Sequence, residues 1–438
     1  MMDNRKTLGQ LFVPICLETL FYMLAGMVDT LMLSSVGDQA VGAVGTANTY
    51  IGMFIIMFSV ISTGMMAVMT QNIGAGKPGV AYQARQIGVM FNIVLGIVIG
   101  AILFFGSGLV LDIVGIADSL RAPAETYLQI VGGCCFLNAL IPIFAGYLRA
   151  FGFMHQSLAA TVIANIMNLC LNAVFLFVFD MGVAGVAIAT VISKAVNLII
   201  VFIASCKLVK AKDDPHRLPR KEVFQQIIKI GLPSALESAL YNFAMTLMIR
   251  FLNQMDPEGL NVTARSYTAQ ITNFSFTIGA ALAGANAILT GWRVGAREFD
   301  ACDKGTKKAA LIGIVVAIAV ESIFALCAEP IMSLFTDDPE MVSIVAKLLA
   351  IDIVLEIGRA TNLVFGNALK TSGDALFPVI IGAIFMFLCT VGGTYFFGIH
   401  LELMVVGAYI GLALDECVRA VAMFLRWQSG IWKTKGVA

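Results

Sequence analysis

Charged residues are scarce in this sequence. Lys, Arg, Asp and Glu make up 13% of its 438 residues, whereas they make up about 25% of a typical soluble domain. Hydrophobic residues make up 59%, and the 28 basic and 28 acidic residues cancel. This composition excludes a soluble globular protein and offers no basic surface for nucleic acid. We therefore expect an integral membrane protein, surrounded by lipid, with no nucleic-acid partner.

Motifs for catalysis are also lacking. The sequence contains no H-E-x-x-H zinc motif, no G-x-S-x-G elbow and no Walker loop G-x-x-x-x-G-K-[ST]. Its nine cysteines include no C-x-x-C pair, and its three histidines fall in predicted loops. We predict that the protein is not an enzyme, has no catalytic residue and no cofactor, and does not use ATP directly.

Long apolar runs, in contrast, are frequent. Stretches of 20 or more mostly apolar residues recur about twelve times, and each is long enough to cross roughly 30 Å of hydrocarbon as a helix. None alternates with the two-residue period of a barrel strand. We predict an all-α integral membrane protein with twelve transmembrane helices, at residues 7–33, 41–72, 85–109, 122–148, 155–179, 183–206, 223–252, 262–291, 304–328, 340–368, 374–398 and 403–427.

Basic residues are distributed unevenly among the loops that separate these helices. With the N-terminus placed in the cytoplasm, 21 of the 28 Lys and Arg residues lie on the cytoplasmic side, 4 lie outside and 3 lie within helices. Cytoplasmic loops of membrane proteins are enriched in Lys and Arg, so this bias fixes the orientation. We predict a multi-pass protein of the cell membrane with both termini in the cytoplasm.

An internal repeat divides the chain into halves. The segment P-I-C-L-E-T-L-F-Y at 14–22 returns as P-S-A-L-E-S-A-L-Y at 233–241, and L-R-A-F-G at 148–152 returns as L-K-T-S-G at 369–373. Six helices separate the copies, so the two halves have the same orientation and are related by a pseudo-two-fold axis along the membrane normal. Transporters built this way bind substrate between their halves.

Domain boundaries follow from this repeat and from the one long polar segment, which contains two prolines and mixed charges. We predict an N-lobe of six helices at 1–206, a solvated cytoplasmic linker at 207–222 and a C-lobe of six helices at 223–438.

The first predicted helix carries two acids, Glu18 and Asp29. Eleven residues, or about three turns, separate them, so they share one helix face at levels roughly 16 Å apart. A charge in mid-membrane costs roughly 2.5 to 3.5 kcal/mol, which suggests a functional role for both. Gly26 lies between them, where it serves either a bend or a packing contact. The position equivalent to Asp29 in the second half is Met248, so the halves differ in chemistry.

Three amides form a stripe on the fifth predicted helix, because Asn165, Asn168 and Asn172 follow i, i+3, i+7 spacing. The stripe either bonds neighbouring helices together or forms a polar cavity wall. On the second interpretation Asp29, Asn168, Asn172 and Thr190 offer oxygens to a cation such as Na⁺.

The second half carries its own acids. Glu237 is equivalent to Glu18 and has only Ser, Tyr and Asn near it in sequence, so it is a candidate proton carrier. Asp352 and Glu356 lie on the tenth predicted helix, where Glu356 and Arg359 can form a structural ion pair at i, i+3. We expect pairing between helices, rather than transport, for a further set at membrane depth: Glu321, Asp415, Glu416 and Arg419.

Taken in order along the chain, these motifs resemble the MATE (multidrug and toxic compound extrusion) family. The resemblance covers nearly the whole sequence. The segments that carry it are M-V-D-T at 27–30, N-I-G-A-G-K at 72–77, L-R-A-F-G at 148–152, N-I-M-N-L-C-L-N at 165–172, G-V-A-G-V-A-I-A-T at 182–190, I-G-L-P-S-A-L-E at 230–237, L-K-T-S-G-D at 369–374 and D-E-C-V-R-A at 415–420.

The resemblance implies two six-helix lobes and export of organic cations and other amphiphiles in exchange for protons or sodium. Members with an N-lobe cation site use an aspartate that matches Asp29, with polar partners that match Asn168, Asn172 and Thr190. Some members place a second acid at position 172, where this chain has asparagine. Other members rely on C-lobe acids, for which Glu237, Asp352 and Glu356 are the candidates, and Glu18 is a further possible substrate or coupling residue.

Two other functions compete with this one. MATE relatives include flippases of lipid-linked saccharide precursors, which need a strongly cationic cavity for pyrophosphate, and this chain has few basic residues within its predicted helices. An intramembrane enzyme is disfavoured by the missing catalytic motifs.

Overall fold

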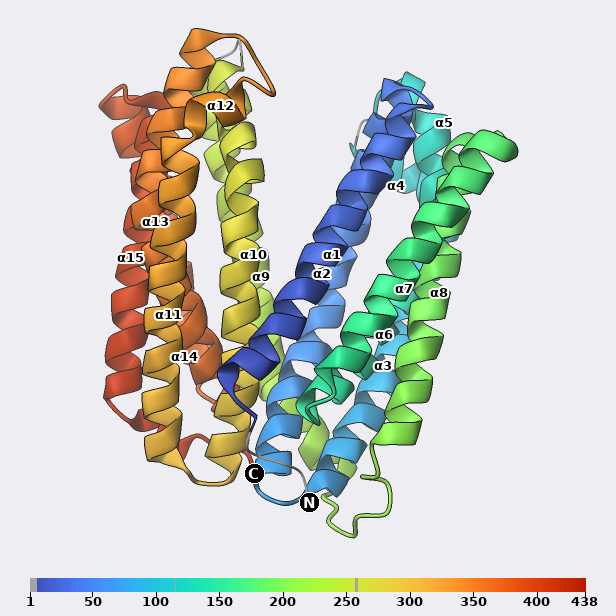
Figure 1. The fold of residues 1–438 in the computed structure, drawn as a ribbon, viewed down its shortest axis with the longest axis vertical. Helices are drawn as coiled ribbons and strands as arrows, with labels where there is room; N and C mark the ends of the chain where they lie inside the picture. The colour runs from blue at the N-terminus through green and yellow to red at the C-terminus, as the bar shows by residue number, and fades with distance from the viewer. Residues whose placement is uncertain (1–5, 115, 257–258) are drawn as a thin grey trace. The chain divides into compact units, whose positions relative to one another are not determined.

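The computed structural model describes residues 6–114, 116–256 and 259–438, and within these ranges it contains helices and no β-strand (Figure 1). The prediction of an all-helical protein is therefore confirmed. The helices are α1 (Leu8–Ser34), α2 (Asp38–Gly74), α3 (Pro78–Phe105), α4 (Ser107–Val114), α5 (Asp118–Tyr127), α6 (Phe136–Ala150), α7 (Met154–Ala173), α8 (Gly182–Leu208), α9 (Arg220–Met255), α10 (Leu260–Gly295), α11 (Phe299–Leu326), α12 (Ala328–Met332), α13 (Pro339–Thr371), α14 (Leu376–Phe385) and α15 (Met404–Gln428).

Short π-helical segments extend several of these helices. They are η1 (Leu128–Gly132), η2 (Val174–Val178), η3 (Met386–Val391) and η4 (Thr394–His400), and a 3₁₀ turn, η5 (Ile431–Thr434), follows α15. π-Helical turns are frequent at functional sites, and η2 begins two residues after Asn172.

Eight of the described helical segments are long and apolar enough to span a membrane, and the bent pair at 118–132 and 136–150 adds a ninth if it counts as one span. α9, α13 and α15 are 36, 33 and 25 residues long but are not among them. α15, for example, carries Asp415, Glu416 and Arg419 within five residues. The total of twelve spans stays a prediction.

Local sequence explains where several helices begin. Thr7 caps α1, because its hydroxyl accepts from the Gln10 N–H at 3.4 Å while Gln10 Oε1 accepts from the Thr7 N–H at 2.9 Å. Pro78 and Pro339 open α3 and α13, where a missing N–H costs no helical hydrogen bond. Capping of this kind stabilises helix ends whose backbone groups would otherwise lack partners.

The chain forms two compact units, Met1–Gly231 and Leu232–Ala438. The boundary lies inside α9 rather than in the linker predicted at 207–222, so this linker packs with the N-terminal unit. Gln83 of α3 holds it through two hydrogen bonds of 3.0 Å, one to the Leu218 carbonyl and one from the Leu218 N–H. Asp214 adds a bond from the Gly79 N–H at 3.2 Å.

Close contact between α2 and α9 explains why the start of α9 belongs to the N-terminal unit. A Cβ added to Gly64 would lie 2.8 Å from the Ile227 carbonyl carbon, and one added to Gly231 would lie 2.8 Å from the Val60 carbonyl carbon. Only glycine permits two helix backbones to approach this closely.

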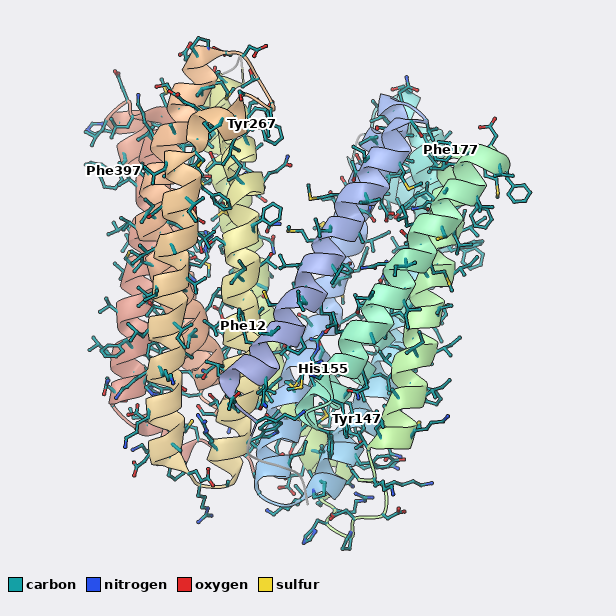
Figure 2. The ribbon with its side chains drawn as sticks, in the orientation of Figure 1. Phe12, Tyr147, His155, Phe177, Tyr267 and Phe397 are labelled. Atoms are coloured by element: carbon teal, nitrogen blue, oxygen red, sulfur yellow. The ribbon has the colours of Figure 1, made fainter. Side chains whose placement is uncertain are left out.

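Each unit has its own apolar core. In the N-terminal unit the core joins α2, α3, α6 and α8 around Phe58 and Leu103, and in the C-terminal unit it joins α9, α10, α13 and α15 around Met248 and Leu348. Large apolar side chains also point outward from the helices (Figure 2). On α3, for example, Met90, Val94, Ile97 and Val98 are each more than half exposed. An apolar outer surface on apolar helices is the arrangement expected of a protein solvated by lipid.

Candidate functional site

The Asp29 carboxylate of α1 meets two amides of α7, a helix that packs along α1 (Figure 1). Asn172 Nδ2 donates to Asp29 Oδ1 at 2.7 Å. Asn168, with its amide turned so that the nitrogen faces the carboxylate, donates to the same oxygen at 2.6 Å. Both asparagines are buried. The structure therefore brings together Asp29, Asn168 and Asn172, and the amide groups that face the carboxylate are N–H donors.

Thr190 of α8 contacts other groups. Its hydroxyl donates to the Val186 carbonyl of its own helix at 2.8 Å. The Tyr127 side chain is a further polar neighbour of Thr190 and of Asn48. No direct bond between Thr190 and Asp29 is found among the described residues, so the predicted set of four residues is only partly assembled.

Lys194 was not singled out in the sequence, although it lies one helical turn beyond Thr190 on α8. It is near enough to Asp29 for the two charges to interact. Its i+4 spacing from Thr190 was the signal that could have identified it. Lys194 is therefore a basic side chain in the neighbourhood of the Asp29 carboxylate.

Asn165, the first member of the amide stripe, serves a different purpose. Its Nδ2 donates to the backbone carbonyl of Phe21 on α1 at 3.1 Å. This bond joins α7 to α1, as the alternative interpretation of the stripe predicted, while Asn168 and Asn172 face a carboxylate.

Glu18 forms a separate polar cluster lower on α1. Its Oε1 accepts from Arg149 Nη2 at 2.6 Å, from the Ser157 hydroxyl at 2.9 Å and from the Thr161 hydroxyl at 3.2 Å. His155 and Tyr147 are near this end of the N-terminal unit, whereas Phe177 lies at the opposite end (Figure 2). Glu18 is thus an ion-paired carboxylate at a different level from Asp29, and a role in substrate binding or coupling stays a prediction.

Glu237 also has a charged partner, contrary to the expectation drawn from its local sequence. Lys370 Nζ lies 2.6 Å from Glu237 Oε2, and each side chain is 16% exposed. Lys370 is at the end of α13, far along the chain, which is why neighbouring residues gave no sign of it. This ion pair does not decide whether Glu237 takes part in coupling, which stays a prediction.

Acidic side chains and two arginines form a network of ion pairs in the C-terminal unit. Arg359 pairs with Glu356, as its i, i+3 spacing predicted, and its Nε lies 3.4 Å from Glu416 Oε1. Arg419 lies 2.9 Å from Glu416 and 2.7 Å from Asp415. The Asp415 and Glu416 contacts with Arg419 are within α15, so only the Glu416 to Arg359 contact is the interhelical pairing expected for this group.

Asp352 is buried but takes no part in these pairs, and its Oδ2 has no hydrogen-bond partner. In the described part of the chain, no three His, Cys, Asp or Glu residues lie where they could hold a metal ion. A Na⁺ site at Asp29, Asn168, Asn172 and Thr190 therefore stays a prediction.

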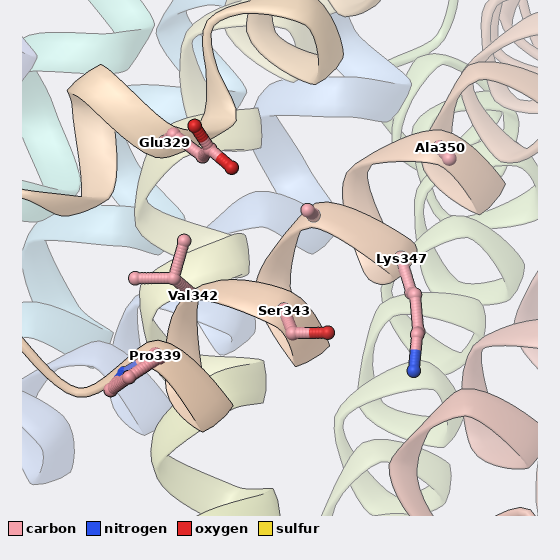
Figure 3. A pocket seen from close by; sticks show the side chains of 7 residues that line it. Glu329, Pro339, Val342, Ser343, Lys347 and Ala350 are labelled. Atoms are coloured by element: carbon pink, nitrogen blue, oxygen red, sulfur yellow. The ribbon is translucent and has the colours of Figure 1, made fainter.

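An open pocket of about 530 Å³ lies between α12 and α13 (Figure 3). Glu329 lines it from α12, and Val342, Ser343 and Lys347 line it from α13. None of the predicted site residues contributes to it, and it is not a candidate for the transport site.

Two units of long apolar helices, each with buried acids that face polar partners, define a multi-pass membrane transporter. The family model named MatE matches residues 14–174 and 233–396. The chain therefore belongs to the MATE family of multidrug efflux transporters, which are not enzymes. This confirms the resemblance seen in the sequence.

Several known relatives match along nearly their whole length. The uncharacterized transporter YisQ of Bacillus subtilis (strain 168) is 34% identical, covering 100% of this chain and 97% of that protein. A probable multidrug resistance protein NorM of Thermotoga maritima is 23% identical, covering 99% and 94%. The outward-facing structure of a multidrug resistance MATE family transporter of the MOP superfamily has a TM-score of 0.90 at 22% identity, covering 98% and 97%.

Proposed function

We propose that this protein exports small amphiphilic or cationic organic molecules across the cell membrane in exchange for protons, with Asp29 as the proton carrier of the N-terminal unit. Membership of the MATE family supports efflux as the activity. The observation that carries the assignment to Asp29 is the contact of its Oδ1 with two buried amides, at 2.7 Å and 2.6 Å. Two N–H donors satisfy an ionised carboxylate.

When Asp29 is protonated, its new O–H group needs a hydrogen-bond acceptor, so one of these amides must accept a hydrogen bond instead of donating one. Asn168 supplies one by turning its terminal amide, which brings Oδ1 to the place that Nδ2 occupied. The buried Asn172 Oδ1, which has no hydrogen-bond partner, is a second acceptor. The site thus accommodates both protonation states of one carboxyl group through a half-turn of a terminal amide.

A sodium ion fits this arrangement less well. Na⁺ needs several oxygen ligands at once, as hard cations do. Here Asp29 is faced by N–H groups, the Thr190 hydroxyl donates to Val186, and the nearby Lys194 side chain offers a nitrogen rather than an oxygen. We therefore favour the proton over sodium, which the family resemblance also permits. No cofactor is required for this exchange.

Coupling requires that the protein with protonated Asp29 and the protein with ionised Asp29 prefer different conformations. A proton that binds both conformations with equal affinity does not shift the equilibrium between them. Gly26, three residues before Asp29, supports a bend of α1. A Cβ added at Gly26 would meet no atom within 4 Å, so this glycine is not required for close packing. We infer that α1 bends near Gly26 when Asp29 changes its protonation state.

A flippase for lipid-linked pyrophosphates remains the second candidate, but the charges disfavour it. Such a substrate needs basic side chains that are free to meet it. Arg149, Lys370, Arg359 and Arg419 are each paired with a carboxylate of their own unit. These basic side chains already form ion pairs within the protein, so they are not free to bind a pyrophosphate.

The ion gradient limits how much accumulation the exchange can drive. One charge that crosses 100 mV supplies about 2.3 kcal/mol, and each tenfold gradient adds about 1.4 kcal/mol. Exchange of one ion therefore supports substrate ratios on the order of tens to thousands. Collapse of the gradient with ATP maintained should stop export, and continued export would contradict the proposal.

Orientation is a further part of the proposal. The 21 to 4 bias of basic residues supports cytoplasmic termini. A reporter that is active only in the cytoplasm should work when fused after Ala438 and fail when fused after Asp338. The opposite pattern would reverse the topology.

The deciding experiment is ethidium efflux from proteoliposomes with proton and sodium gradients imposed separately. We expect the wild type to respond to the proton gradient and Asp29→Asn to lose this response while inserting normally. Asp180→Asn, the same substitution at an exposed turn after η2, is the matched control and should export as the wild type does. Equal export by Asp29→Asn at every pH would make the site structural, and a response to sodium alone would identify sodium as the coupling ion.

A further inference from the structure

An arginine in the second turn of α3 lies among aromatic rings. The guanidinium carbon of Arg85 lies 4.7 Å from the centre of the Tyr82 ring, also on α3. Two rings of α6 are close as well, Tyr147 at 4.9 Å and Phe144 at 5.7 Å. The negative face of an aromatic ring attracts a cation, and this attraction is stronger where water is excluded. The three rings therefore hold the guanidinium in place, but they do not supply the oxygen acceptors that its N–H groups need.

Hydrogen-bonding capacity is left over in this cluster. A guanidinium carries five N–H donors. The buried Nε of Arg85 has no hydrogen-bond partner, and Arg85 belongs to no ion pair among the described residues. The hydroxyl of the fully buried Tyr147 has no partner either. The Arg85 side chain as a whole is partly exposed, so a ligand that brings oxygen atoms can reach it from the surface.

A second guanidinium comes from the linker. Arg217 lies over the same Tyr82 ring, at 5.5 Å from its centre. It donates to two backbone carbonyls, those of Lys212 at 2.7 Å and His216 at 3.5 Å, and forms no ion pair in the described part of the chain. Two guanidinium groups thus share one ring without a carboxylate to neutralise them. A guanidinium presents a planar fork of donors that matches a phosphate group.

The nearby linker acid does not change this balance. The Asp214 carboxylate accepts from the Gly79 N–H at 3.2 Å and from the His216 N–H at 2.9 Å, and it lies 3.1 Å from the His216 ring. Its contacts are therefore with the backbone and with histidine rather than with either guanidinium.

An exposed apolar surface lies beside the two arginines. The Phe144 ring meets Phe202 of α8 edge to face, with 5.3 Å between centroids. Phe202 and the next residue, Ile203, are both nearly half exposed. On α3 the exposed Met90 follows Arg85 by five residues, which is about 7.5 Å along the helix. The guanidinium groups are thus placed where the apolar surface ends, at the level that lipid headgroups occupy.

We propose that Arg85 and Arg217 bind the phosphate of an anionic phospholipid whose acyl chains lie against Phe202 and Ile203. An anionic headgroup fits better than a zwitterionic one, because neither arginine is accompanied by an acid that could meet an ammonium group. In the orientation proposed above, this surface is the cytoplasmic one, where anionic lipids attract basic side chains. The inference does not depend on Asp29 or on the ion that drives export.

Native mass spectrometry of the purified full-length protein tests this inference. The protein in detergent is titrated with phosphatidylglycerol or with phosphatidylcholine that carries the same acyl chains. We expect the wild type to bind phosphatidylglycerol about tenfold more tightly. Arg85→Gln should lose this preference, and Arg217→Gln should reduce it. Arg85→Lys keeps the charge but not the planar fork, so it should restore the preference only in part.

Arg220→Gln is the matched control, because it removes an exposed arginine at the start of α9 and changes the net charge equally. It should bind both lipids as the wild type does. A loss of preference in Arg220→Gln equal to that in Arg85→Gln would overturn the proposal, since net charge alone would then explain the binding.

Inorganic phosphate is the competitor that separates a lipid from a free anion. Displacement of phosphatidylglycerol by an equal concentration of inorganic phosphate would overturn the lipid assignment. Equal affinity of the wild type for the two lipids would overturn it as well, as would an unchanged preference in both Arg85→Gln and Arg217→Gln. If Arg85→Gln does not fold, Arg217→Gln decides the question, because its side chain is exposed on the linker.

Discussion

The two units share one ion pair and differ in almost all other buried charge. Glu18 of α1 meets Arg149 at the end of α6, and Glu237 of α9 meets Lys370 at the end of α13, each at 2.6 Å. The acids lie in the repeated P-x-x-L-E segment and the bases in the repeated L-[RK] segment. Duplication thus preserved a contact between two distant helices, which identifies this pair as part of the common architecture.

The other charged side chains inside the two units differ. Asp29 of the N-terminal unit accepts hydrogen bonds from neutral amides, and the nearby Lys194 forms no direct ion pair with it among the described residues, while the equivalent Met248 is a fully buried core residue. The C-terminal unit instead holds a network of acids bridged by two arginines. Neutral amides leave Asp29 free to change its charge, whereas arginines fix the charge of their carboxylates. This contrast suggests that a carboxyl group in this protein can exchange a proton only where no arginine holds it.

The largest effect should follow from breaking the arginine network. Arg419→Gln leaves Asp415 and Glu416 buried without their main partner, and removal of one member of a buried ion pair costs about 3 to 5 kcal/mol. We expect a marked fall in the midpoint of thermal unfolding in detergent. Arg121→Gln, which breaks the exposed pair with Asp112, should cause no measurable change. Equal midpoints for both variants would show that the network does not stabilise the C-terminal unit.

A second difference lies in the segments that follow the last helix of each unit. After α15, Trp432 stacks on Trp427 at 4.1 Å between ring centroids and contacts Phe299 at the start of α11. Trp432 is 1% exposed and donates to the Trp427 carbonyl at 2.9 Å. After α8, the linker reaches the start of α3 mainly through polar contacts, the hydrogen bonds of Asp214 and Leu218 and the Arg217 guanidinium over the Tyr82 ring at 5.5 Å. One unit uses aromatic packing where the other uses polar contacts.

Trp432→Ala should therefore be the next largest effect, because truncation of a buried tryptophan costs about 3 kcal/mol or more. The neighbouring Ile431→Ala, at a residue that is 37% exposed, is the control and should change little. Thermal unfolding of the two variants measures the difference. A small effect of Trp432→Ala would mean that the tail adds nothing to the C-terminal unit.

The fold was largely predictable because its information is local. Apolar run length predicted an all-helical membrane protein, while the total of twelve spans and the division into lobes at the linker stay predictions. What sequence could not predict is which helix packs against which. The boundary inside α9 depends on Gly64 meeting Ile227 and on Gln83 meeting Leu218, contacts between residues more than a hundred positions apart.

In the candidate site, too, the sequence predicts contacts that follow from spacing within one helix and misses contacts with distant helices. Asp29, Asn168 and Asn172 come together because i, i+4 spacing places both amides on one face of α7, opposite α1. The partner of Glu237 could not be found this way, since Lys370 lies on another helix. For Glu321 the sequence predicts an ion pair, and none forms among the described residues.

The shared ion pair should give an intermediate effect, which a double-mutant cycle in each unit can measure. We expect coupling of about 1 kcal/mol for Glu18→Gln with Arg149→Gln, discounted because Arg149 is 29% exposed. Glu237→Gln with Lys370→Gln should give a similar value if both pairs are structural. If Glu237→Gln instead abolishes efflux at unchanged stability and insertion, while Glu18→Gln does not, the duplicated pairs have acquired different roles.

The smallest effect should come from the linker of the N-terminal unit. Burial acts to raise the pKa of Asp214, but hydrogen bonds from the His216 N–H, the His216 ring and the Gly79 N–H outweigh it and hold the pKa below its ordinary value. A lowered pKa in the folded state means that the ionised carboxylate contributes stability near neutral pH and that this contribution is lost as the pH falls through the lowered value. Asp214→Asn should mimic that loss at neutral pH.

Limited trypsin digestion at neutral pH measures this loosening, because Lys212 and Arg217 flank Asp214 in the linker. We expect Asp214→Asn to be cleaved faster there than the wild type, with no change in the midpoint of thermal unfolding. Asp213→Asn removes an adjacent, exposed carboxylate and should be cleaved as the wild type is. If both variants are cleaved alike, Asp214 does not hold the linker, and the Gln83 contacts with Leu218 would be the ones that dock it on α3. The linker and the tail after α15 then differ in how they detach. A segment held by a few polar bonds can leave the surface of its unit without unfolding it, whereas removal of a buried tryptophan exposes the core of its unit.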